Sequence, residues 1–339
     1  MTDTSPATLS EIGTSAQFAP ADLVDLVVAA EQAGFAGVGF SDWDHFWSPL
    51  EGKGTWSEAM GWLAALSRTA GRKALGTLVL SNSFRPQVVF ARHATTVALL
   101  SGRRVLLGLG AGGVDRLAGG VEGDWPEPRE RYERLRESVE IIRRLWTGET
   151  VSFDGEYYRT HDAYGYPVSE QGPVPIIVAG SPEVAKRAAR VGDGFLCFSG
   201  SGPDAYDESL LPAFKAGAAA GGRDDAFRDR VIELKSYYDV AERAALEETR
   251  GWAPLSLARD QKHSVADPVA MPGRDDELVK EQVAKRWIVG SSPDEAVAAI
   301  QPYVDAGLFH LVFHAPGGDQ DRFLELFDED VRAYLRSLA

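Results

Sequence analysis

Short apolar segments alternate with longer segments of helical periodicity along most of the chain. The helical pattern is clearest over residues 129–146, where apolar side chains recur every three or four positions. The intervening runs are short and continuously apolar, which is typical of strands buried on both faces. We expect strands at residues 9–13, 37–40, 74–80, 104–109, 175–179, 195–198, 231–234 and 311–313, and helices from about Leu23 to Gly34 and at 58–70, 87–101 and 129–146.

This alternation favours a parallel sheet with helices on its faces. About eight strands, and no Gly-x-Gly-x-x-Gly pattern after the first of them, favour a (β/α)8 TIM barrel over a doubly wound α/β sheet. Barrels with insertions commonly reach 339 residues, so we expect a single domain over residues 1–339. Two insertions, near residues 151–172 and 252–285, interrupt the alternation, and Asp154-Gly155 in the first indicates a hairpin or a similar excursion.

The composition of the chain limits the classes of partner that we expect for it. The formal net charge of −15 argues against nucleic acid, because phosphate backbones are bound mainly by clustered Lys and Arg, and any phosphate site must be local. No apolar run approaches the ~20 residues that span a bilayer, and the first ten residues do not read as a secretory signal. The single cysteine, Cys197, follows two apolar residues and reads as a packing residue in a reducing compartment. We expect a cytoplasmic protein with neither a membrane nor a nucleic-acid partner.

Catalytic groups of a barrel lie on the loops that follow its strands. The strand expected at residues 37–40 runs into Ser-Asp-Trp-Asp-His-Phe-Trp, in which His45 stands among carboxylates and aromatic rings. A histidine in this position is a candidate acid–base group near neutral pH; the alternative is a histidine that only hydrogen-bonds within its loop. His310 and His314 are four residues apart but lie on an expected strand, so we expect no metal site.

Two further turns are rich in backbone amides. Residues 107–113 hold four glycines, which let the backbone approach a flat ligand or a phosphate, although such turns are also common for steric reasons. Residues 179–186 combine a strand end and a helix start, which suits a phosphate or simply a well-capped helix. Glu183 would oppose an anion there if it pointed inward. Lys262 and Arg286, in or beside the second insertion, are candidate anion clamps or ordinary surface residues.

Eight strings along the chain carry a resemblance to a known family: AQFAP at 16–20, GT at 76–77, FR at 84–85, GDGF at 192–195, WAPLSL at 252–257, QKHS at 261–264, AKRWIV at 284–289 and HLVFHAPG at 310–317. Together they resemble the F420-dependent glucose-6-phosphate dehydrogenases. The resemblance extends over nearly the whole chain and implies a luciferase-like (β/α)8 barrel, coenzyme F420 and a homodimer.

The resemblance implies a role for each matching residue. Asp44 would contact the deazaflavin ring and His45 would exchange a proton with the substrate hydroxyl, although matching from the left offers Asp42 in place of Asp44. Leu78-Val79 would carry the family's non-prolyl cis peptide in a bulge behind the ring. The remaining residues that would line the coenzyme are Ser81, Ala111, Gly112, Gly180, Ser181, Glu183 and Val184.

The chain departs from the family at the substrate. Lys262 and Arg286 match two of the four groups that hold the sugar phosphate, but Phe198 replaces the threonine and Ser201 the second lysine. Losing one charge-assisted contact costs about 1.5–3 kcal/mol, or roughly tenfold to a hundredfold in affinity. The family's acid–base glutamate falls on Gly113, and the nearby Asp115 is a candidate substitute.

Two hypotheses about the substrate follow. The chain oxidises a sugar or sugar-phosphate hydroxyl, such as that of glucose 6-phosphate or a related hexose 6-phosphate, with coenzyme F420. Alternatively, it uses F420 on a non-phosphorylated alcohol, ketone or enone. Two readings from other classes are a flavin-dependent monooxygenase of the same superfamily and a non-catalytic deazaflavin carrier.

Overall fold

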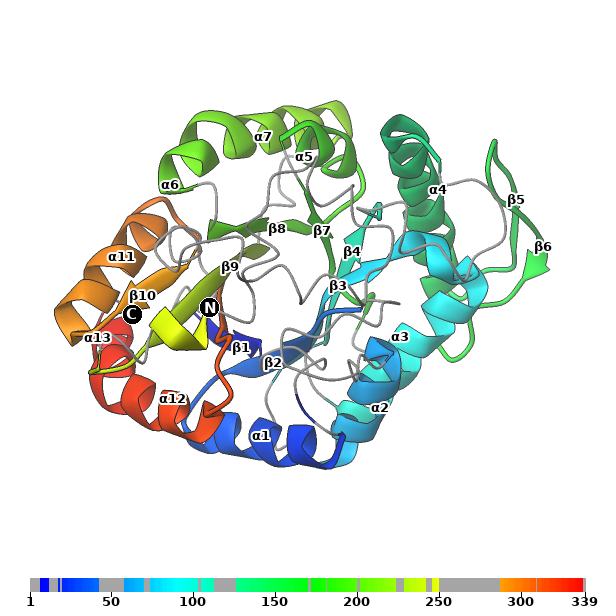
Figure 1. Cartoon of the computed structure of the whole chain (residues 1–339). Helices are drawn as coiled ribbons and strands as arrows, with labels where there is room; N and C mark the ends of the chain where they lie inside the picture. Colours follow the sequence, from blue (N-terminus) through cyan, green and yellow to red (C-terminus); the bar gives the residue numbers. More distant parts are fainter. Residues whose placement is uncertain are drawn as a thin grey trace.

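Eight parallel strands close into a barrel in this computed structural model (Figure 1). The structure describes residues 7–11, 18, 20–42, 58–69, 74–102, 105–112, 126–169, 172–180, 182–199, 202–223, 229–241, 246–249, 287–308 and 310–337. In order around the barrel the strands are β1 (Ala7–Glu11), β2 (Gly37–Phe40), β3 (Ala74–Ser81), β4 (Val105–Gly110), β7 (Ile176–Ala179), β8 (Gly194–Phe198), β9 (Asp229–Tyr238) and β11 (His310–His314). Because β11 pairs with β1, the sheet closes, and the predicted (β/α)8 fold is confirmed.

Helices surround the barrel and cover the outer face of its sheet (Figure 1). They are α1 (Pro20–Gln32), α2 (Ala59–Thr69), α3 (Gln87–Ser101), α4 (Pro128–Trp146), α5 (Pro182–Ala188), α6 (Gly202–Ala205), α7 (Leu211–Ala220), α11 (Pro293–Asp305), α12 (Gln320–Leu326) and α13 (Arg332–Ser337). A short 3-10 helix, η1 (Asn82–Phe84), and two π-helices, η4 (Tyr206–Leu210) and η9 (Phe327–Val331), accompany them. Local chemistry sets their ends. Gly102 ends α3 in the left-handed conformation that glycine favours, and the Ser292 side chain caps α11 by accepting from Glu295 N.

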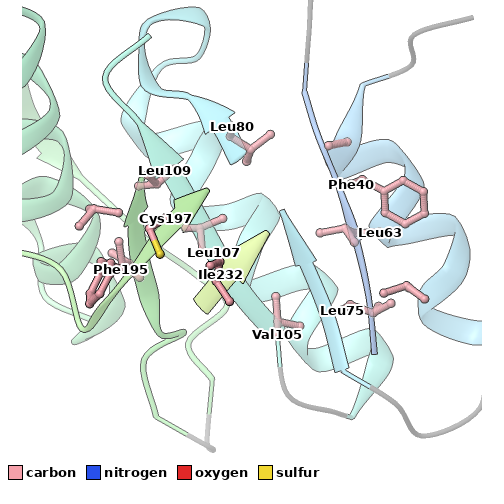
Figure 2. Packing of buried hydrophobic residues seen from close by; sticks show 14 of the residues in the cluster. Phe40, Leu63, Leu75, Leu80, Val105, Leu107, Leu109, Phe195, Cys197 and Ile232 are labelled. Atoms are coloured by element: carbon pink, nitrogen blue, oxygen red, sulfur yellow. The ribbon is translucent and has the colours of Figure 1, made fainter. Parts of the chain in front are cut away.

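Side chains of β3, β4, β7, β8, β9 and β11 alternate between two apolar layers. On β8, Phe195 and Cys197 point outward and pack with side chains of the helices, as Figure 2 shows for part of this layer. Leu196 belongs instead to a second cluster, which contains Leu78, Leu106, Ile177, Ala179, Val231 and Val312. Members of six different strands touch one another in this second cluster, so it fills the inside of the barrel. Burial raises the pKa of Cys197 to about 12, which agrees with a packing role and not with a nucleophile.

The structure describes only the first of the two predicted insertions. The first is an antiparallel hairpin of β5 (Val151–Asp154) and β6 (Arg159–Ala163), which lies beside α4 (Figure 1). The second, at 252–285, lies outside the described residues. No helix in the described part of the chain is long and apolar enough to cross a bilayer. The assignment of one domain to residues 1–339 stays a prediction.

One strand is longer than its apolar run predicts. We expected a strand over 231–234, but β9 spans ten residues, Asp229–Tyr238. Its carboxyl-terminal part pairs in parallel with β10 (Ile288–Gly290), a strand that the sequence pattern did not predict. The extra length therefore depends on a partner that lies about fifty residues further along the chain.

Candidate active site at the carboxyl ends of the barrel strands

The carboxyl ends of the eight parallel strands meet at one rim of the barrel, where active sites of this architecture lie. The structure brings seven of the predicted site residues to this rim or to the elements that begin there: Leu78, Val79, Ser81, Ala111, Gly112, Gly180 and Phe198. Glu183 and Val184 follow in the first turn of α5. The predicted Asp44, His45, Ser181, Ser201, Lys262 and Arg286, together with Gly113 and Asp115, lie outside the residues that the structure describes.

A bulge in β3 forms one wall of the rim. The register between β3 and β4 shifts between Thr77 and Leu80, and the Leu78–Val79 peptide is cis, as the resemblance implied. Glycines on both neighbouring strands leave the space for this bulge. A methyl group at Gly39 would lie 2.2 Å from Leu78 Cδ1, and one at Gly108 would lie 2.0 Å from Thr77 O.

Hydrogen bonds tie the bulge to the same two strands. The Ser41 hydroxyl donates to the Leu78 carbonyl oxygen at 2.9 Å from the end of β2. The Thr77 hydroxyl donates to the Gly108 carbonyl oxygen at 2.9 Å across to β4. The backbone of the bulge is therefore held from both sides, which gives the rim a rigid wall.

Two buried oxygens directly after the bulge have no protein partner in the described part of the chain: Ser81 Oγ and Asn82 Oδ1. The Asn82 amide nitrogen, in contrast, donates to the Tyr158 hydroxyl at 3.3 Å. A buried polar atom without a partner loses its hydration free energy, so such atoms need an explanation. A polar ligand against Ser81 would supply one.

Asp42 forms an ion pair with Arg85. Its carboxylate accepts two hydrogen bonds from the Arg85 guanidinium, at 2.7 and 3.0 Å, and a third from Ala59 N at 3.2 Å. Arg85 also contacts Glu58. Burial acts to lower the pKa of Arg85, but hydrogen bonds and charges from Asp42 and Glu58 outweigh it and raise this pKa. With Asp42 engaged in this way, Asp44 is the better candidate for the coenzyme contact.

The two glycine turns lie next to each other on the rim, after β4 and β7. Gly112 adopts a φ of 85°, which favours glycine, and its carbonyl oxygen accepts a hydrogen bond from Arg131 of α4 at 3.1 Å. After β7, Gly180 packs closely on Val184, where an added methyl group would lie 2.2 Å from Cγ1. Both turns therefore present backbone at the rim.

Glu183 points away from the rim. Its side chain is 67% exposed and pairs with Arg187 one turn further along α5, at 3.0 Å. The repulsion that an inward carboxylate would impose on an anion is therefore absent. Glu183 can contribute to a ligand site only through its backbone, a point that the sequence did not decide.

Phe198 lies at the carboxyl end of β8, the strand next to β7. The four preceding residues of β8 are buried, whereas Phe198 is 42% exposed at the end of the strand. Its register partner is Glu233 on β9. A bulky aromatic side chain thus lies at the position that the resemblance assigned to a phosphate-binding threonine.

A cluster of ionisable residues beside Phe198 was missed as a site by the sequence analysis. Glu233 Oε1 lies 3.1 Å from His314 Nδ1 and 3.6 Å from Lys235 Nζ, and the Lys235 ammonium lies 5.6 Å from the centroid of the Trp287 ring. The signal was present in β9, where charged residues occupy alternate positions of an apolar strand. His314 was considered only for metal spacing.

The charged groups of this cluster shift the pKa values of one another. Burial would raise the pKa of Glu233, but the charge of Lys235 and the hydrogen bond with His314 outweigh it and lower this pKa. Burial lowers the pKa of His314, against the opposing effect of Glu233. Glu233 is therefore ionised and His314 neutral at neutral pH.

Comparisons with known proteins agree with this geometry. A family model described as luciferase-like monooxygenase matches residues 4–310. The chain is 51% identical over 326 residues to a protein of Rhodococcus hoagii named F420-dependent glucose-6-phosphate dehydrogenase, covering 95% of this chain and 96% of that one. It is also 51% identical to the protein of the same name from Mycolicibacterium gilvum, with the same coverage.

Solved structures share the fold at lower identity. An F420-dependent secondary alcohol dehydrogenase, solved with an F420–acetone adduct, superposes with a TM-score of 0.86 at 22% identity, over 97% of this chain and 99% of that one. The coenzyme F420-dependent tetrahydromethanopterin reductase of Methanopyrus kandleri superposes with a TM-score of 0.79 at 20% identity, over 98% and 99%. The chain therefore belongs to the luciferase-like family of (β/α)8 barrels, in the branch of the F420-dependent glucose-6-phosphate dehydrogenases.

Proposed function

We propose that this chain transfers a hydride between a hydroxyl group of a sugar or sugar phosphate and coenzyme F420. Glucose 6-phosphate or a related hexose 6-phosphate is the first candidate substrate. The observation that carries the proposal is the 51% identity with F420-dependent glucose-6-phosphate dehydrogenases over 95% of the chain. We propose, in addition, that the chain is cytoplasmic, which its single cysteine supports, and that it is a homodimer, as the resemblance implies. Sedimentation of the purified protein measures its assembly.

The rim fits a flat coenzyme that carries polar groups. Hydrogen bonds from both neighbouring strands hold the backbone of the β3 bulge, and the buried Ser81 hydroxyl oxygen after it has no partner in the described part of the chain. When bound, F420 supplies a deazaflavin ring that accepts or returns the hydride. The residues that we propose to hold it are Asp44, Leu78, Val79, Ser81, Ala111, Gly112, Gly180, Ser181, Glu183 and Val184, the last two through the start of α5.

The chain's own residues handle the substrate. We propose that His45 takes up the proton of the substrate hydroxyl during oxidation and returns it during reduction. Lys262 and Arg286 would bind the phosphate group, with Phe198 and Ser201 completing that pocket. Charge-assisted bonds from two cations are strong enough to hold a phosphate against a net charge of −15 when they are local.

A second candidate function keeps the coenzyme and changes the substrate. The exposed, bulky Phe198 at the end of β8 favours it, because an aromatic ring offers no hydrogen bond to a phosphate. In this alternative the substrate is a non-phosphorylated alcohol, ketone or enone.

The test is coenzyme turnover. Oxidised F420 is mixed with the protein and glucose 6-phosphate, fructose 6-phosphate or mannose 6-phosphate, and the loss of deazaflavin absorbance is followed. We expect turnover with at least one of them, and we expect His45→Ala to lower kcat by about 10²–10⁴-fold, the usual contribution of an acid–base group. The matched control is His93→Ala, an exposed histidine on α3, which should keep full turnover.

The other outcomes are equally informative. Binding of F420, seen by its fluorescence, without turnover of any hexose phosphate would favour the second candidate, and the same assay with alcohols and ketones would then identify it. Full activity of His45→Ala would remove His45 from the proton transfer. Oxygen consumption with reduced FMN would replace the proposal by a monooxygenase.

A further inference from the structure

The interior of the barrel becomes polar at its catalytic end. Val231 on β9 and Val312 on β11 belong to the apolar interior cluster. Because side chains alternate along a strand, Glu233 and Lys235 on β9 and His314 on β11 face the same interior, one and two steps nearer the rim. Lys235 and His314 are register partners, so the three side chains form one compact cluster.

Buried ionic groups of this kind usually stabilise the folded state less than apolar side chains would. The side chains of Glu233 and His314 are only 6% and 3% exposed, so the carboxylate has lost nearly all of its hydration. Replacing such buried ionic groups by apolar ones of similar volume is often stabilising. Ionisable groups that are buried at the catalytic end of a barrel are therefore candidates for function.

Lys235 is the member of the cluster that reaches the solvent. Its side chain is 23% exposed, and its ammonium lies between Glu233 and the face of Trp287. The Nζ–Oε1 distance of 3.6 Å is longer than an ordinary charge-assisted hydrogen bond. An ammonium has three N–H donors, so one carboxylate at this distance leaves donor capacity for a ligand.

The charges of Glu233 and Lys235 together favour a neutral hydroxyl ligand over a phosphate. The negative charge of Glu233 offsets the positive charge of Lys235, so the pair attracts a phosphate only weakly. A hydroxyl oxygen gains a donor from Lys235 at no comparable electrostatic cost. Phe198, the register partner of Glu233, adds an exposed aromatic surface that suits the C–H groups of a sugar ring.

We propose that Lys235 is a specificity-determining residue that donates a hydrogen bond to a hydroxyl oxygen of the sugar, and that Glu233 and His314 are positioning residues for it. The inference rests on the proposed function, because it assigns part of the same substrate site. It assigns to Lys235 a contact with a hydroxyl of the sugar, whereas Lys262 and Arg286 are proposed to bind the phosphate group.

The test compares Lys235→Met with Lys215→Met, a matched change on the exposed face of α7. Calorimetry measures the binding of glucose 6-phosphate and of inorganic phosphate, and fluorescence measures the binding of F420. For Lys235→Met we expect Kd and KM for glucose 6-phosphate to rise about tenfold, which is the loss of about one hydrogen bond. We expect unchanged affinities for phosphate and F420, and kcat within about threefold of the wild type.

The positioning role has its own readout. Glu233→Gln and His314→Gln should raise KM for the sugar phosphate while leaving F420 affinity unchanged, and Lys235→Arg should recover part of the affinity lost in Lys235→Met. Thermal unfolding shows whether each variant is folded. If Glu233→Gln does not fold, Lys235→Met and Lys235→Arg decide the proposal, because Lys235 is partly exposed.

Three results would overturn the inference. Unchanged sugar binding by Lys235→Met removes the subsite, and an equal loss of inorganic phosphate affinity makes Lys235 a phosphate contact. Failure of the wild type to bind any hexose or hexose phosphate removes the subsite together with the sugar substrate. Sugar binding without hydride transfer to F420, in contrast, contradicts only the proposed function.

Discussion

Gly39 and Gly108 lie on the two strands that flank β3, and each leaves the space that the bulge occupies. At Gly108 the nearest atom is the Thr77 carbonyl oxygen, which belongs to the backbone and cannot move aside as a flexible side chain can. The shape of the bulge thus depends on the absence of a methyl group at each of these two positions.

We therefore predict that Gly108→Ala destabilises the protein by about 1–3 kcal/mol, the usual cost of overpacking, and weakens F420 binding. Denaturant unfolding and coenzyme fluorescence measure the two effects. Gly76→Ala on β3 is the control, because its new methyl group would lie 3.5 Å from the nearest atom, an ordinary contact. Equal behaviour of the two variants would contradict the close approach at Gly108.

We predict that substitutions of Asp42 and Asp44 affect different properties, namely stability for Asp42 and F420 affinity for Asp44. Asp42→Asn weakens the ion pair with Arg85 and should lower the free energy of unfolding by about 1.5–3 kcal/mol, with F420 affinity nearly unchanged. Asp44→Asn should show the reverse pattern. Titration of F420 fluorescence and guanidinium unfolding test both variants. A large loss of coenzyme affinity in Asp42→Asn alone would exchange the two assignments.

At the scale of elements, the β5–β6 hairpin is held to α4 by one buried carboxylate. Glu137, 3% exposed, accepts hydrogen bonds from Glu156 N, Tyr157 N and Tyr158 N at 3.0–3.1 Å. The same hairpin carries the Tyr158 hydroxyl, which accepts a hydrogen bond from Asn82 directly after the bulge of β3. The helix, the hairpin and the rim are thus connected through a single turn.

We predict that Glu137→Ala lowers the free energy of unfolding by about 1–3 kcal/mol, because it leaves buried backbone donors without an acceptor. Amide hydrogen exchange at residues 156–158 should accelerate. Glu140→Ala is the control on the same helix, since Glu140 is 46% exposed and pairs only at the surface. Unchanged exchange in Glu137→Ala would show that other contacts hold the hairpin.

The elements were predicted well where their signal is local. The predicted helix at 87–101 and strand at 37–40 match α3 and β2 at both ends, because turns and glycines bound them in the sequence. The length of β9 was wrong and β10 was missed, because a pairing between distant segments creates them. Local patterns carry no information about such a partner.

The site residues likewise divide into those that a local sequence pattern predicts and those that only the folded structure brings together. The turns of the site after β4 and β7 were predicted because glycines and apolar runs are adjacent in the sequence, whereas its residues on β3 were implied only by the family resemblance. The Glu233–His314 pair joins residues 81 positions apart, so only the closed barrel brings them together. The outward direction of Glu183 likewise depends on its pairing with Arg187, which the helix geometry decides.

For the whole molecule, burial of His314 makes stability depend on pH. The folded state holds His314 with a lowered pKa, whereas the unfolded chain takes up its proton near pH 6.5. Below that pH the unfolded state binds more protons, so acidification favours unfolding, by at most about 1.4 kcal/mol per pH unit for this group. The contribution is fully present above pH 6.5 and is lost as the pH falls.

We predict that His314→Gln reduces the loss of stability between pH 7.5 and 5.5, whatever its effect on stability at pH 7.5. Guanidinium unfolding at the two pH values measures the difference. His93→Gln, at an exposed position of α3, should retain the pH dependence of the wild type. An unchanged slope in His314→Gln would place the acid sensitivity elsewhere.

Cys197 has a practical consequence at this scale. It is the one cysteine of the chain, it is buried between the barrel and its helices, and burial raises its pKa to about 12. Thiol reagents react with the thiolate, which is scarce at such a pKa. A cysteine introduced at an exposed position, such as Glu140, should therefore take up a fluorescent or spin label selectively, with Cys197 left in place. Because Cys197 would stay unlabelled, distances between the introduced label and the fluorescent coenzyme can be followed during turnover.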